Sequence, residues 1–162
     1  MSRSGLLSFP NPVNEKAARA VAGGVVLLAV AALVTESAWV ALAMAVGFAL
    51  RVASGPRFSP LGRLAVHVVA PRLGAAVLVP GPPKRFAQAI GLTFTVSATV
   101  AGFAGATTLF TALLAVLLVF ATLESVAGFC AGCWVFGHLM RLGVIPEETC
   151  EACNDISLRR AG

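Results

Sequence analysis

The chain has 162 residues, of which 58% are hydrophobic and only 12% are charged. The charged share is about half that of an ordinary soluble domain, so there is too little polar material to cover a soluble protein of this size. Twelve Lys and Arg against seven Asp and Glu give a net charge of +5. A basic face against anionic lipid headgroups accounts for this charge, and no nucleic-acid partner is expected.

Long uncharged runs predict four membrane-spanning helices, at about 17–35, 37–53, 85–103 and 106–127. Backbone polar groups in hydrocarbon must be hydrogen-bonded within a helix or a closed barrel, and these runs lack the polar alternation of barrel strands. The expected fold is therefore all-α, an integral membrane four-helix bundle. The first run is expected to be retained rather than cleaved, because a second apolar run follows it instead of a polar mature region.

Three parts are expected along the chain: an N-terminal arm at 1–14, a four-span membrane domain at 15–143 and a cytoplasmic CxxC tail at 144–162. Asn14 has a side chain suited to capping the first helix. Arg19 and Arg51 lie near the ends of the first two apolar runs. Their charges are expected to extend into the lipid headgroups.

The connection at 54–84 is the longest segment between the predicted spans. Ser59 and Pro60 have the residue types of a helix cap and a first helical position, and an amphipathic stretch follows them. We therefore expect an interfacial helix within this connection. The run at 81–83, Gly-Pro-Pro, is expected to end the connection before the third span.

The distribution of basic residues predicts the orientation of the spans. With four spans, every Lys and Arg falls on one side, and the two turns on the opposite side carry none. The positive-inside rule then predicts a multi-pass protein of the bacterial cytoplasmic (inner) membrane, with both termini in the cytoplasm. The basic residues are Arg3, Lys16, Arg19, Arg51, Arg57, Arg63, Arg72, Lys84, Arg85, Arg141, Arg159 and Arg160.

All cysteines of the chain lie in two CxxC pairs, Cys130/Cys133 and Cys150/Cys153. Cysteines used only as small hydrophobic residues would be scattered through the apolar segments. On a continuous helix leaving the membrane, Cys130 and Cys133 would share one face. Pro146 is expected to open a second short helix, with Cys150 and Cys153 in its first two turns. These four thiols are the candidate site.

Three interpretations of the thiols stay open. In the first, favoured by the apolar neighbours of Cys130, the protein is a membrane-anchored thiol relay. The tail pair passes electrons or sulfane sulfur to a soluble thioredoxin- or rhodanese-like partner, and the interfacial pair exchanges with the tail. In the second, all four cysteines bind zinc in a non-enzymatic membrane scaffold, because the C-x2-C-x16-C-x2-C spacing fits the zinc pattern. The third is packing alone. Transport of a small sulfur species is a further option.

Glu124 is the one acidic residue inside a predicted span, and such acids are functional candidates by default. On a continuous helix its side chain would point away from Cys130. We therefore expect it to pair with Arg51 or Arg85 rather than to exchange protons with a thiol.

His138 is the histidine nearest to the thiols in the sequence. It would join a metal site only if the helix broke near Gly137, and we expect it at the membrane interface instead. The chain has no P-loop, dinucleotide-binding, zinc-protease or nucleophile-elbow motif, so nucleotide hydrolysis, Rossmann cofactors and serine hydrolysis have no support. Whether the chain is an enzyme stays open.

Three blocks carry a resemblance to a known family: residues 14–19 (NEKAAR), 81–91 (GPPKRFAQAIG) and 129–133 (FCAGC). Over residues 10–155 the chain resembles a family of small bacterial membrane proteins, common in actinobacteria and catalogued as a domain of unknown function. The resemblance implies four spans, a cysteine-bearing C-terminal end and an association with thioredoxin-like or rhodanese-like sulfur proteins. It implies no particular activity.

Overall fold

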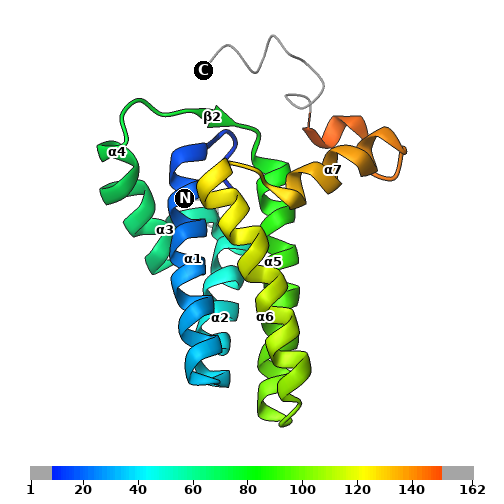
Figure 1. Ribbon diagram of the computed structural model, residues 1–162. Helices are drawn as coiled ribbons and strands as arrows, with labels where there is room; N and C mark the ends of the chain where they lie inside the picture. The colour runs from blue at the N-terminus through cyan, green and yellow to red at the C-terminus, as the bar shows by residue number, and fades with distance from the viewer. Residues whose placement is uncertain (1–8, 151–162) are drawn as a thin grey trace, which may run out of the picture.

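The computed structural model describes residues 9–150, apart from the side chains of Glu147 and Cys150. The long helices stand side by side as a bundle (Figure 1). Four helical stretches are long and apolar enough to cross a membrane. They contain α1 (Glu15–Thr35), α2 (Ala38–Ser54), α5 (Gly81–Phe103) and α6 (Thr107–Thr122), which a π-helical turn extends over Leu123–Ala127. The predicted all-α four-helix bundle is confirmed.

Small residues bring the four helices together. Ala29, Ala32, Ala41 and Ala98 are fully buried in the shared core, in which α1 and α5 each pack on both α2 and α6. Many large apolar side chains point outward instead, such as Leu27, which is 73% exposed. Such a surface suits lipid, where small residues allow close helix packing and apolar residues need no burial in the protein.

The two ends of the bundle differ in construction. At one end, tight turns join α1 to α2 and α5 to α6, and Gly105 adopts a left-handed conformation with φ 74°. At the other end, β1 (Val13–Asn14) pairs with β2 (Leu78–Val79), which ties the entry to α1 to the segment before α5. Asn14 accepts a hydrogen bond from the backbone N–H of Lys16 at 3.0 Å, so the predicted cap is confirmed.

The 54–84 connection contains α3 (Pro60–Leu64), a π-helical stretch over Ala65–Val69, and α4 (Ala70–Arg72). Ser59 caps α3 as expected, with its side chain accepting from Gly62 N–H at 3.3 Å. The resulting helix leans along α1 (Figure 1), with Leu61 seated at Gly24. Its relation to the plane of a membrane stays a prediction.

The expectation that Gly81-Pro82-Pro83 ends the connection is wrong, because these residues form the first turn of α5. Proline is tolerated there since the first backbone N–H groups of a helix have no partner within the helix. Gly81 N–H instead donates to the Asn11 side chain at 3.0 Å. The third span therefore begins at Gly81, earlier in the chain than predicted, and it carries Lys84 in its first turn.

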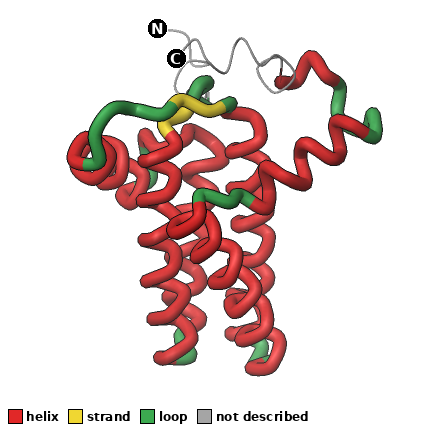
Figure 2. Tube along the Cα trace, turned by 45° about the horizontal axis from the view of Figure 1, so that its top comes forward, coloured by secondary structure: helices red, strands yellow, loops and turns green. Residues whose placement is uncertain are grey.

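The expectation of a continuous helix through Cys130 is also wrong. The π-helical turn ends at Gly128, which is left-handed with φ 70°. A new helix, α7 (Ala131–Arg141), then starts with Cys130 as its N-cap residue. Figure 2 shows the loop between them and α7 running away from the bundle at a steep angle to the long helices. The first CxxC pair therefore lies at the start of a separate helix.

Gly132 determines how closely α7 packs on α5. A Cβ atom at Gly132 would come within 2.6 Å of the Cα of Ala87, whereas a Cβ at Gly137, further along the same helix, would meet nothing within 4 Å. On the next turn, Phe136 is buried and contacts Phe86 edge-on, with 5.6 Å between ring centroids. The start of α7 thus rests directly on the backbone of α5.

Gly132→Ala and Gly137→Ala form a matched pair that tests this contact. We expect Gly132→Ala to lower the free energy of unfolding by about 1–3 kcal/mol through overpacking against Ala87. Gly137→Ala is expected to raise it by up to about 1 kcal/mol, because alanine favours a helix interior. Unfolding in detergent, followed by circular dichroism, measures both. Equal effects of the two substitutions would contradict the close approach at Gly132.

Candidate thiol site

Cys130 and Cys133 face each other at the first turn of α7. The two Sγ atoms are 2.7 Å apart and both thiols are free. The backbone N–H of Cys133 donates to Cys130 Sγ at 3.4 Å, so Cys130 caps the helix as Ser or Asp would. Cys130 is buried and Cys133 is half-buried. This N–H and the partial positive charge of the helix start stabilise negative charge on the Cys130 sulfur.

Glu124 lies one element away from the thiols and pairs with Lys84. The Lys84 Nζ and Glu124 Oε1 atoms are 2.8 Å apart, and both side chains are largely buried. The predicted partners, Arg51 and Arg85, are wrong: Arg85 donates instead to the Val52 carbonyl at 3.0 Å. The ion pair joins the π-helical turn that extends α6 to the first turn of α5, beside the CxxC pair.

Burial and hydrogen bonding make the two thiols unequal. The pKa of Cys130 lies below its usual value, chiefly because the Cys133 thiol donates a hydrogen bond to it. Burial and the Glu124 carboxylate oppose this, whereas the Lys84 ammonium and the Cys133 N–H also lower the pKa of Cys130. The shared hydrogen bond and burial raise the pKa of Cys133. Cys130 is thus the better nucleophile of the pair.

Cys130 lies on the wall between two cavities. One, of about 460 Å³, is lined by both thiols and by the charged residues Glu15, Lys84 and Arg141. The other, of about 190 Å³, lies inside the bundle and is lined by Cys130 but not by Cys133. We call the first the outer cavity and the second the inner cavity. One sulfur therefore contacts a charged space and an apolar one.

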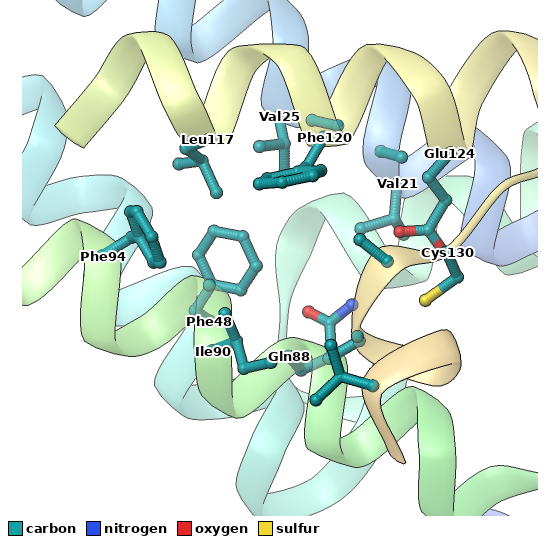
Figure 3. Close-up of a pocket in the computed structure, with 17 residues that line it drawn as sticks. Val21, Val25, Phe48, Gln88, Ile90, Phe94, Leu117, Phe120, Glu124 and Cys130 are labelled. Atoms are coloured by element: carbon teal, nitrogen blue, oxygen red, sulfur yellow. The ribbon is translucent and has the colours of Figure 1, made fainter. Parts of the chain in front are cut away.

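The inner cavity has a polar end and an apolar end. Figure 3 shows the Glu124 carboxylate, the Gln88 amide and Cys130 Sγ on one side, with Phe94 and Leu117 at the opposite end. The expectation that Glu124 points away from Cys130 is wrong, because the break at Gly128 folds the chain back and brings both residues to one wall.

Arg51 was expected to reach the headgroups, but it turns into the bundle. Its Nε donates to Gln88 Oε1 at 2.8 Å, its Nη1 donates to Ser59 Oγ at 3.1 Å, and its guanidinium lies 4.4 Å from the centre of the Phe48 ring. Arg19 is half-buried and forms hydrogen bonds within the protein. It donates to the Ser125 and Val126 carbonyls at 3.1 and 2.7 Å, capping the end of the fourth span.

Sequence reasoning missed Lys84 and Gln88 as parts of the site. Both lie in α5, one helical turn apart, on the face that meets Glu124 and Arg51. Two polar residues four apart near the start of an apolar span lie on one helix face, and this pattern could have indicated that both belong to the site. In the sequence, Lys84 counts only among the basic residues, and both residues fall within the family block at 81–91.

The remaining predicted site residues lie elsewhere or outside the described residues. His138 is exposed on α7, with Nδ1 3.0 Å from the Trp134 carbonyl oxygen, and it lines neither cavity. Cys150 ends a 3₁₀ turn (Glu147–Cys150), with its side chain not described, and Cys153 lies outside the described residues. Among the side chains that the structure does describe, no three His, Cys, Asp or Glu form a metal-binding group.

The fold and the site together define a small helical membrane protein with a dithiol at one end of its bundle. The chain belongs to the family described as domain of unknown function DUF4395, whose profile matches residues 13–141. The predicted membership of an uncharacterised family is confirmed. Neither a curated protein nor a solved structure matches the chain.

Opposite charge changes at the ion pair test its influence on Cys130. Lys84→Met removes a positive charge and is expected to raise the pKa of Cys130, whereas Glu124→Gln removes a negative charge and is expected to lower it. The pH dependence of iodoacetamide labelling of Cys130, followed by mass spectrometry, measures both. Shifts in the same direction would mean that both variants simply distort the site.

Proposed function

We propose that this protein is a membrane-anchored thiol protein that relays electrons or sulfane sulfur to a soluble thioredoxin- or rhodanese-like partner. The observation that carries this proposal is the pair of free thiols 2.7 Å apart at the N-terminus of α7. Cys130 has a lowered pKa, and Cys133 is close enough to resolve a mixed disulfide formed on it.

The exchange balances without an added reagent. A Cys130 thiolate attacks a disulfide of the next thiol pair, forming a mixed disulfide and releasing one thiolate. Cys133 then attacks Cys130, forming the internal disulfide and releasing the second thiolate. Two electrons and two protons pass to the acceptor. In the sulfur-carrying variant, Cys130 holds a persulfide, and its outer sulfur passes to an acceptor thiolate.

The outer cavity supports exchange with a thiol-bearing segment. Both thiols line it together with Arg141, whose positive charge attracts an approaching thiolate or persulfide anion. In the proposed route, Cys150 and Cys153 act between this cavity and the soluble partner. Their joint presence with Cys130 and Cys133 also keeps a zinc site of four thiolates as the competing function.

Single serine substitutions test the relay. Cys133→Ser removes the resolving thiol, so Cys130 is expected to accumulate in a mixed disulfide or persulfide. Cys130→Ser is the matched control and is expected to trap far less, because Cys133 has the raised pKa. Cells are quenched with acid, free thiols are alkylated without reductant, and the trapped species are identified by mass spectrometry.

The competing zinc site predicts a different result in the same samples. Four thiols that stay free, with stoichiometric zinc released when they are alkylated, would contradict the relay. In that case Cys150→Ser should also release the metal, because zinc bound by four thiolates depends on all four.

We further propose that the protein lies in a bacterial cytoplasmic membrane with both termini in the cytoplasm. The basic residues at the ends of the long helices support this, since Lys16, Arg51, Lys84 and Arg85 lie at the same end of the bundle. Reporter fusions after Gly162 and within the α1–α2 turn are expected to report the cytoplasm and the exterior, respectively. A C-terminus on the exterior would contradict this orientation and place the thiols in an oxidising compartment.

A further inference from the structure

The inner cavity has features that neither packing nor the thiol relay alone explains. It is walled by aromatic and aliphatic side chains from α1, α2, α5 and α6, yet Cys130 and two polar side chains lie at one end. An acyl chain would fill the apolar part but would offer nothing to the polar groups. A fully polar solute would not suit the apolar walls.

We propose that the inner cavity binds the ring of a lipid-soluble quinone or quinol, which exchanges two electrons with the Cys130/Cys133 pair. The inference rests on the proposed function and deepens it by naming the membrane partner of the dithiol. The ring lies between the aromatic walls, and its oxygens face Gln88, Glu124 and Cys130.

The size and the walls of the cavity suit such a ring. An apolar cavity of about 150 Å³ accepts a benzene-sized molecule. The inner cavity measures about 190 Å³ and has Phe48, Phe94 and Phe120 in its walls. Phe120 is 44% exposed, and Ile90 and Phe94 are half-buried, so the walls on α5 and α6 reach the lipid-facing surface. An isoprenoid tail leaves on this side.

The polar end suits the oxygens of a quinone. Gln88 Oε1 accepts the hydrogen bond from Arg51 Nε at 2.8 Å, which fixes the amide orientation. Its amide nitrogen then lies on the cavity side of α5, toward the end that holds Cys130 (Figure 3). An N–H donor there matches a quinone carbonyl and is not used by a hydrocarbon chain.

The redox step balances with the quinol as the co-reactant. A quinol gives two electrons and two protons to the Cys130–Cys133 disulfide, the S–S bond breaks, two thiols form, and a quinone remains. The reverse step forms the disulfide and the quinol. The reduction potentials of the two couples determine the direction in the cell. Because the step is reversible, it can be assayed with reduced protein and added quinone.

The test uses the full-length protein in lipid nanodiscs, with decylubiquinone as the probe and excess dithiothreitol to reduce the Cys130–Cys133 disulfide again after each turnover. The rate of quinone reduction by dithiothreitol alone is subtracted. This ring is fully substituted, so thiols cannot simply add to it, and its absorbance reports reduction. Wild type is expected to show saturable reduction. Val25→Phe, which fills the cavity from a buried position on α1, is expected to lower kcat/KM about tenfold or more. Val30→Phe makes the same change at a 44% exposed position of α1 and should stay near wild type.

A second variant protects the test against misfolding of Val25→Phe. Gln88→Glu keeps an acceptor for Arg51 but removes the amide donor, so the KM for decylubiquinone is expected to rise roughly three- to tenfold. Equal rates for Val25→Phe and Val30→Phe, or an unchanged KM in Gln88→Glu, would overturn the quinone site. Inhibition by decane at the same concentration as by a quinone analogue would do so too, because it would indicate an acyl-chain site.

Different measurements test the thiol relay and the quinone site, so the failure of one can be distinguished from the failure of the other. Thiol trapping in wild type and Cys133→Ser reports the relay without any quinone. If trapping succeeds while quinone reduction is insensitive to the cavity, only the quinone site is overturned. If the reduced pair neither traps a partner nor exchanges with a soluble disulfide, the relay itself fails, and the quinone step fails with it.

Discussion

The buried ion pair between Lys84 and Glu124 joins the first turn of α5 to the π-helical turn after α6, where the chain leaves the bundle. Removing two charges from water is costly, and a partner left alone in a buried place is costlier still. The pair therefore holds two helix ends together and sets the position from which the loop to Cys130 departs. It also places one charge of each sign beside the thiols, and these act oppositely on the pKa of Cys130.

The basic residues have two roles: they indicate the orientation in the membrane, and some of them form contacts inside the protein. The number of charges at each end of the bundle does not distinguish these roles. Their one-sided distribution indicates an orientation in the membrane, yet several are engaged inside the protein. Arg51 binds Gln88 and Ser59, and Arg19 caps the end of the fourth span. A guanidinium can serve both roles because its stem packs against apolar side chains while its fork satisfies several acceptors.

The sequence alone predicted the ends of the four long helices to within a few residues. An uncharged run long enough to cross a membrane must hydrogen-bond its own backbone in lipid, and a helix does this. It also identified the Cys130/Cys133 pair. It did not predict the break before Cys130, although Gly128 is the residue type that ends helices in a left-handed conformation. The contact of Lys84 with Glu124, 40 residues away, depends on how two helices cross, which no local pattern determines. Placing Glu124 on a continuous helix led directly to the wrong partners.

The separation of Lys84 from Glu124 along the chain bears on how the protein is made. Lys84 leaves the ribosome 40 residues before its partner, so α5 meets the membrane carrying a lysine that nothing yet neutralises. A lone lysine opposes insertion by up to about 3 kcal/mol at the centre of a span, and by less near an end. We therefore expect the insertion machinery to hold α5 until α6 has been synthesised. The two helices would then enter the bilayer as one hairpin, already joined by their charges.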